Sequence, residues 1–255
     1  MRHPHPRPRS RLLAVWLLLP AAALALLLQM PAQALAGLLA AACQQQCRLA
    51  ETAGPWWAGR GQLFVRSPGE AQWHALGSLS WQALAGDDEL FAIDLADGRA
   101  VLDRHLEIRI ERLRLPASLV LGHPDWQLPA TGWQGSIELS QTSISRDGRR
   151  PGESHGHLTW RGAASGLLEN HPLGDLHAAW QWHPTRGLSA ELDGGRAGEI
   201  ALSGHLHAPA DGAAALTAEV TLDGESRRVL DRYLRAFAAP QADQPGRYAL
   251  AWSVR

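Results

Sequence analysis

Apolar and polar side chains alternate along most of the chain beyond residue 60. In segment 214–223, for example, Leu216, Val220 and Leu222 occupy one phase, and Thr217 and Glu219 the other. A period of two is typical of a β-strand with one buried face. The pattern predicts about ten strands. They are centred on residues 63–65, 79–81, 106–110, 137–139, 158–160, 176–183, 199–207, 214–223 and 248–254.

Turn residues separate these runs, including Asp97-Gly98, Asp193-Gly194-Gly195 and Asp223-Gly224. Such clusters join antiparallel strands in hairpins. The polar stretch 143–155 is expected to be a loop. One late segment has helical spacing instead, with apolar residues at 229, 230, 233, 234 and 237 before Pro240. The sequence therefore predicts a mainly β fold: an antiparallel, Trp-rich sheet domain with a short membrane-proximal helix and one C-terminal helix.

A basic tail precedes a long apolar run at the amino terminus. Arg2, Arg7, Arg9 and Arg11 come before any acidic residue, and the run extends from Leu12 to Met30. As a helix it would be about 28 Å long, close to the hydrocarbon thickness of a bilayer. Since basic flanks stay in the cytoplasm, we expect residues 1–11 there, 12–30 as a transmembrane anchor and 31–255 as an exported β-rich domain.

Two other interpretations of this end are less favoured. Ala32-Gln33-Ala34 would suit a signal-peptide cleavage site, but the apolar run exceeds the roughly 7–15 residues of a signal-peptide core. A lipoprotein signal would place its cysteine directly after the run, whereas Cys43 follows three alanines, thirteen residues beyond Met30. The membrane anchor is therefore the favoured interpretation.

Cys43 and Cys47 are the two cysteines of the chain. In an oxidising compartment such a pair usually closes. Helical i,i+4 spacing would put their Cα atoms about 6 Å apart, within disulfide range. A redox or metal pair would need Cys-x-x-Cys spacing or further ligands, and the three intervening glutamines offer none. The sequence therefore predicts a local disulfide.

Charge and motif content argue against several functional classes. The chain has 24 basic and 25 acidic residues and a formal charge of -1, so it lacks the basic field of a nucleic-acid binder. It contains no Lys for Schiff-base chemistry. The G-x-S-x-G, H-E-x-x-H, phosphate-loop and G-x-G-x-x-G motifs are missing from the sequence. We expect no enzyme, no catalytic residue and no cofactor.

Histidine and tryptophan are frequent, with 12 and 11 copies. His155 with His157, and His205 with His207, would each share the polar face of a strand. We expect solvated imidazoles there, and no metal site, because no carboxylate-rich partner lies beside them in the sequence. Most tryptophans fall on the apolar phase and would fill a sheet core. The alternative is a groove for an acyl chain or for another protein's strand.

Several short motifs resemble those of type II secretion system protein N, the general secretion pathway protein N family. An L-x-W strand motif follows a G-x-x-W-x-G segment. The family pattern is L-x-W-x-L, whereas in this chain the last leucine, Leu84, comes one position later. A P-L-G motif comes later in the chain, and the resemblance extends nearly to its end. The matching residues are Gly54, Trp57, Gly59, Leu79, Trp81, Pro172, Leu173 and Gly174.

This resemblance implies an accessory component of the machine that moves folded proteins across the outer membrane of a Gram-negative bacterium. It implies a single-pass inner-membrane protein with a periplasmic C-terminal domain, whose partners are the inner membrane and other type II secretion components in the envelope. The family's β-rich part is also similar to AsmA-type proteins, so an anchored lipid-binding module is the alternative. Gly54 and Gly59 would bracket Trp57 at a helix-to-strand corner, where the Trp would plug the sheet's end.

Overall fold

The computed structural model describes residues 29–43, 45–66, 72–84, 86, 88–121, 132–147, 150–168, 171–210, 212–235, 238–241 and 244–254. The predicted cytoplasmic tail and nearly all of the predicted anchor, residues 12–30, lie outside this set. Within the described part, no helix is both long and apolar enough to cross a bilayer. The anchor and its topology therefore remain predictions.

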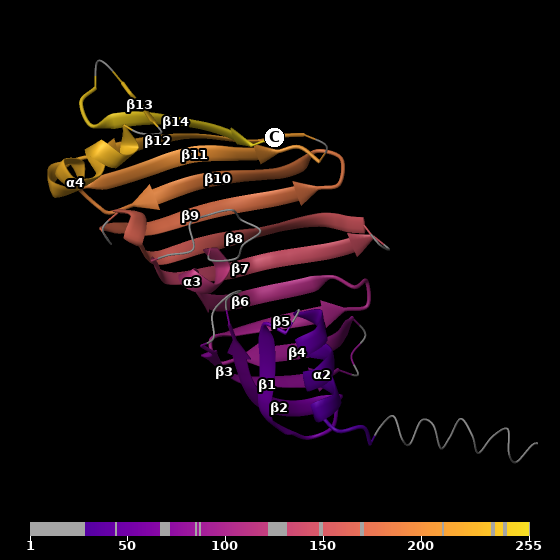
Figure 1. The fold of residues 1–255 in the computed structure, drawn as a ribbon. Coiled ribbons are helices and arrows are strands. Elements are labelled where there is room, and N and C mark those ends of the chain that lie inside the picture. Colours follow the sequence, from indigo (N-terminus) through magenta and orange to yellow (C-terminus); the bar gives the residue numbers. More distant parts are fainter. Residues whose placement is uncertain are drawn as a thin grey trace, which may run out of the picture.

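The described residues form one 14-stranded antiparallel sheet in which almost every strand pairs with its neighbours in sequence (Figure 1). The order changes at the carboxyl end, where β14 lies between β12 and β13. The mainly β, antiparallel fold predicted from the alternation is confirmed. The strands are β1 (Cys47–Ala53), β2 (Ala58–Val65), β3 (His74–Ala83), β4 (Glu89–Leu95), β5 (Gly98–Asp103), β6 (Ile108–Pro116), β7 (Trp133–Asp147), β8 (Arg150–Ser165), β9 (Pro172–His183), β10 (Gly187–Gly195), β11 (Ile200–Ala208), β12 (Ala214–Leu222), β13 (Ala238–Pro240) and β14 (Arg247–Val254).

Short helices accompany the sheet in the described residues. They are α2 (Gln33–Ala42), α3 (Ala117–Leu121), the 3-10 turn η2 (Gly166–Leu168) and α4 (Gly224–Leu234). The existence of α2 and α4 confirms the two helices predicted from the sequence. In α4, Leu230 is buried while Arg227 and Arg228 are exposed, as expected of a helix with one face against a sheet.

The alternation pattern underestimates the number of strands. In β4, for example, both Leu90 and Phe91 are apolar, and strict alternation is lost. The loop predicted over residues 143–155 is wrong, because this stretch lies in the long hairpin of β7 and β8. Its polar residues have low strand propensity, but its two arms pair with each other, and the residues at both ends of the stretch also pair with β6 and β9. This pairing overrides the local preference.

One face of the sheet is apolar almost from end to end. Side chains directly opposite each other on neighbouring strands share a face, so strand register traces a row across the sheet. Between β7 and β8 the row continues from Thr142 to Gly156, because a Cβ on Gly156 would contact the side chain of Thr142. The row is Trp81, Ile93, Ala100, Ile110, Thr142, Gly156, Trp180, Ala190, Leu206 and Leu216. Thr142 is its one polar member.

Two helices cover the two ends of this apolar face. At the first end, Leu35 and Leu39 of α2 pack on a buried cluster that includes Leu79 and Trp81. At the other end, Leu230 of α4 is buried with residues of β11, β12, β13 and β14. That second cluster is Ile200, Val220, Leu222, Leu230, Ala238 and Tyr248. The two clusters thus lie under α2 and α4, which are far apart along the sheet (Figure 1). Between them, residues such as Ile110, Ala117 and Ile137 are also buried.

The G-x-x-W-x-G segment forms the corner between β1 and β2, not the predicted corner between helix and first strand. Gly54 turns the chain with a φ of +96°, which glycine adopts without a steric penalty. A Cβ on Gly59 would lie 2.5 Å from the ring of Trp81, so glycine permits the close approach of that indole. The side chain of Trp57 is 39% exposed, whereas Trp81 is 5% exposed. Trp81 therefore occupies the buried position at the end of the sheet that the sequence predicts for Trp57. The Nε1–H of Trp81 donates to the carbonyl of Trp56 at 2.9 Å.

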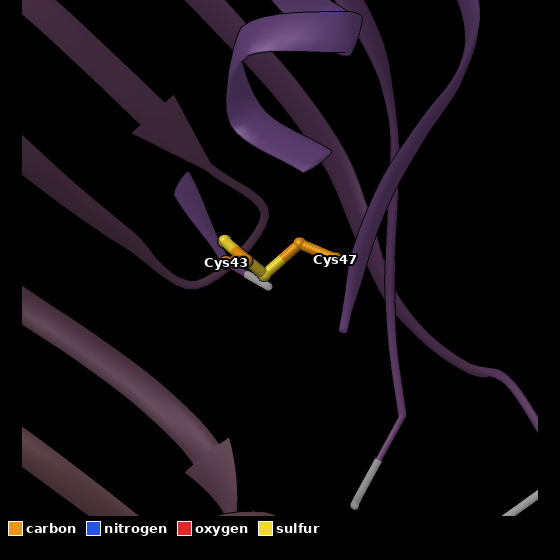
Figure 2. Close-up of a disulfide and its surroundings, with 2 residues drawn as sticks. All are labelled: Cys43 and Cys47. Atoms are coloured by element: carbon orange, nitrogen blue, oxygen red, sulfur yellow. A yellow bond between two sulfur atoms is a disulfide. The ribbon is translucent and has the colours of Figure 1, made fainter. Parts of the chain in front are cut away.

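Cys43 and Cys47 face each other across the turn from α2 to β1 (Figure 2). The helix ends at Ala42, so the predicted helical spacing is wrong for this pair. The turn nevertheless brings their Cα atoms to 5.6 Å, and the structure joins the two sulfur atoms. This geometry supports the predicted disulfide, and we propose it as a local staple between α2 and β1.

We predict that Trp81→Ala lowers the free energy of unfolding by about 3–5 kcal/mol, because it empties a buried aromatic position. Trp57→Ala is the matched control and should cost clearly less than Trp81→Ala, since Trp57 is 39% exposed and Trp81 only 5%. Denaturant unfolding of the full chain, followed by circular dichroism, measures both. Equal destabilisation by the two changes would contradict the assignment of Trp81 as the core residue.

We predict that neither cysteine is alkylated in the exported protein unless a reductant is added. Mass spectrometry of peptides after alkylation measures this directly. Replacing both cysteines with Ser should reduce stability by about 2 kcal/mol, because the closed loop is short. Recovery of two alkylated thiols without reductant would rule out the staple.

Candidate functional site

The polar face of the sheet carries four of the histidines singled out in the sequence. His155 lies opposite Gln181, which lies opposite Ser189, and Ser189 lies opposite His207. The adjacent row runs from His157 through Ala179 and Glu191 to His205. These side chains border a shallow hollow of about 450 Å³. The structure thus brings the four imidazoles onto one face, in two pairs on β8 and β11.

The two histidine pairs are too far apart to share one metal ion. Two strands separate β8 from β11, and three strand spacings amount to about 14 Å. Metal–nitrogen bonds are only about 2 Å long. Within the described residues, no group of three or more His, Cys, Asp or Glu side chains is arranged to hold a metal. The hollow is therefore a polar surface of imidazoles, amides and one carboxylate.

A charged network crosses the polar face at β6, β7 and β8. Glu138 is 5% exposed and accepts hydrogen bonds from Arg114 at 2.9 Å and Arg161 at 3.1 Å. The Nε of Arg112 lies 3.4 Å from its other oxygen. The hydrogen bond from Arg114, followed by that from Arg161, lowers the pKa of Glu138 against the opposing effect of burial. The carboxylate is fully charged and paired, so the network joins three strands and is not a proton donor.

A second polar cluster attaches α4 to the sheet. Ser226 is fully buried, and its hydroxyl donates to Oε2 of Glu199 at 2.7 Å. Nε2 of His171 lies 2.8 Å from the same hydroxyl oxygen. The hydrogen bond from Ser226 is the main cause that lowers the pKa of Glu199. Sequence motifs do not reveal this cluster, because its members lie far apart in the chain.

This Ser, His and Glu cluster does not have the arrangement of a nucleophilic triad. In a triad the carboxylate orients the imidazole, which in turn activates the hydroxyl. Here the carboxylate accepts directly from Ser226, and the hydroxyl is buried under α4. A substrate cannot reach it in this conformation. The cluster fixes the start of α4 over the sheet.

The middle of the apolar face lacks a second layer in the part of the chain that the structure describes. There, β8, β9 and β10 make their extensive contacts with neighbouring strands, and no helix packs extensively over them. Their large apolar side chains are half-buried instead of buried. Members of this uncovered patch are Leu158, Trp160, Leu176, Trp180, Trp182, Leu188 and Leu192. Nε1 of Trp182 is buried without an acceptor among the described residues.

An aliphatic cavity of about 150 Å³ lies where α4 meets the sheet. Its lining combines Leu230 and Leu234 of the helix with leucine, isoleucine and valine side chains of β9, β11 and β12, and with Leu168 of η2. The cavity is partly open to solvent, so its aliphatic walls are only partly removed from water.

The residues that carry the family resemblance lie in two separate parts of the sheet. Leu79 and Trp81 belong to the cluster under α2, and Gly54 and Gly59 shape the adjacent corner. In the second part, Pro172 begins β9 and is exposed, and Leu173 lines the aliphatic cavity. Gly174 has a φ of +91°, and a Cβ there would collide with the carbonyl of Gly195 on β10. The structure therefore separates these motifs and does not assemble them into one site.

Comparison with known proteins identifies the family. The family described as type II secretion system (T2SS), protein N matches residues 45–251, from just before β1 to within β14. Searches of the curated proteins and of the solved structures found no match. The family match covers most of the chain and nearly the whole sheet. The chain therefore belongs to the type II secretion system protein N family.

Proposed function

We propose that this protein is an inner-membrane-anchored, periplasmic accessory component of a type II secretion system, which supports transport of folded proteins across the outer membrane. The observation that carries the proposal is the family match over residues 45–251. Other secretion components in the envelope are its expected partners, and no nucleic acid is involved. The described polar clusters support a scaffold, because each serves to connect strands or to fix α4.

The long sheet suits a component that connects other parts of an assembly. Strand spacings of about 4.8 Å, added over the sheet, separate its ends by about 60 Å. The end under α2 follows the predicted anchor directly, so the α4 end would project away from the membrane. Partners bound near the two ends would then be held at different distances from the inner membrane.

The uncovered apolar patch favours a second candidate function, an anchored lipid-binding module similar to AsmA-type proteins. Half-buried leucine and tryptophan side chains on β8, β9 and β10 offer a continuous apolar surface. Contiguous apolar surface of this kind usually marks a site for a ligand, a membrane or another protein. Both candidates place the sheet outside the cytoplasm and need the same anchor.

We predict that a reporter active only after export functions when it is fused after Arg255. The apolar run over residues 12–30 and its basic flank carry this topology. Sequencing of the amino terminus of membrane-extracted protein should find residue 1 or 2, without cleavage after Ala34. Activity of a cytoplasm-only reporter at the same position would refute the anchor and its orientation.

We predict that deletion of this protein makes substrates of its own secretion system accumulate, at least partly, in the periplasm. Export across the inner membrane should continue, because other machinery performs that step. Fractionation of a secreting strain, with an immunoblot of one substrate in periplasm and medium, measures the effect. Unchanged secretion in the deletion strain would sink the proposed function.

Complementation with histidine variants tests the scaffold against a catalytic or metal function. His155→Ala with His157→Ala, and separately His205→Ala with His207→Ala, should restore secretion to the level of the unmodified protein, because these imidazoles are exposed. A second immunoblot, against the variant protein itself, reports its abundance. Lost secretion with an abundant, folded variant would instead assign a chemical function to the polar face.

A further inference from the structure

The aliphatic cavity under α4 is distinguished by the chemistry of its walls. Every side chain that lines it is Leu, Ile or Val, supplied by η2, β9, β11, β12 and α4. Its volume is about 150 Å³. The cavity is partly open to solvent, and a water molecule inside it would find no hydrogen-bond partner on its walls, so small apolar groups are favoured there. The walls therefore select hydrocarbon.

A hydrocarbon chain suits this cavity better than a peptide. A strand or helix inserted between Leu202 and Leu234 would bring backbone N–H and C=O groups among aliphatic side chains. Buried backbone groups without partners are costly. A methylene chain carries no such groups. The end of an acyl chain can fill the cavity without any polar cost.

The cavity continues along the strands into the uncovered apolar patch. Leu176 and Leu202 line the cavity, and the next residues on the same face of their strands are Ala178 and Gly204. These small residues lie opposite Leu192 from either side, because β10 separates the two strands. Because the side chains of these residues are small, they leave space above the backbone directly beside the cavity. A chain that ends under α4 can therefore run out over β9, β10 and β11.

From these observations we propose that the cavity under α4 binds the end of one acyl chain of a membrane phospholipid, whose remainder lies on the uncovered patch. The inference rests on the second candidate function, lipid binding, and names its binding site. The described chain begins at residue 29, at the α2 end of the same apolar face, where the predicted membrane anchor would deliver the sheet to a bilayer. The anchor would attach the sheet to a phospholipid bilayer, so phospholipid is the acyl-chain source. Because the α4 end lies about 60 Å from the α2 end, the bound molecule would be one that has left the bilayer.

The test uses the full-length protein reconstituted in vesicles of phosphatidylethanolamine and phosphatidylglycerol. A fraction of the phosphatidylethanolamine carries a diazirine at the end of one acyl chain. After illumination, peptide mass spectrometry locates the labelled residues. Label should concentrate on residues of the cavity wall, in particular Leu173, Leu230 and Leu234.

Two variants narrow the cavity from opposite walls. Leu202→Trp fills it from the sheet and Leu234→Phe from the helix, and each should reduce label on the other wall residues about fivefold or more, because the added ring occupies the space of the chain end. Ser203→Trp is the matched control. It introduces the same indole one residue along, on the exposed opposite face, and should change the label by less than about twofold.

The outcomes separate this inference from the function on which it rests. Label on the apolar face but not on the cavity wall overturns the cavity assignment and leaves lipid binding intact. No label on the apolar face overturns both. Undiminished label on the cavity wall of Leu234→Phe also overturns the assignment. If circular dichroism shows that Leu202→Trp does not fold, the result for Leu234→Phe decides alone. The secretion proposal does not depend on any of these results.

Discussion

The constraint on which this structure depends is that a sheet with one apolar face must cover that face, and the described part of the chain has little with which to do so. Strands that are neighbours in sequence pair side by side, so the same alternation places apolar side chains on the same face from Trp81 to Leu216. In a sandwich, a second sheet would cover them. Here the described cover consists mainly of α2 and α4 at the two ends, and hydrophobic burial is strongest there.

Polar interactions fix the strands and helices individually, where the described residues supply no second layer. Three arginines on β6 and β8 converge on Glu138 of β7 and connect the middle strands across the polar face. Ser226 and Glu199 hold the beginning of α4 in place, so the helix covers one end without a large interface. In the middle, half-buried apolar side chains have not gained their full transfer free energy, roughly 25 cal/mol per Å² of apolar surface. That free energy remains available to a partner that covers them.

Much of the fold could be predicted from the sequence, because period-two alternation is a local property of the chain. It located β11 and β12, and helical spacing located α4. It missed β4, where apolar residues occupy both phases. It misassigned residues 143–155, whose strand structure depends on pairing between their two arms and, at the ends of the stretch, with β6 and β9. The site was less predictable. Alternation shows which face Trp180 and Trp182 occupy but not what covers that face, so core and groove could not be distinguished. Trp57 and Trp81 show the same limit, since only the approach of β3 to Gly59 decides which indole is buried.

The two candidate functions do not compete for the same surface. Protein contacts in a secretion assembly suit the polar face, where imidazoles, amides and the charged groups around Glu138 are presented to solvent. A lipid suits the opposite, apolar face and its cavity. Adjacent residues such as Leu202 and Ser203 point to these opposite faces, so a change at one leaves the other nearly untouched. If a lipid covers the apolar face, it also supplies the missing layer, and the stability of the middle strands becomes linked to lipid binding by mass action. The sheet would then be a better scaffold when it is loaded, which makes a role in secretion and a role in lipid binding parts of one mechanism.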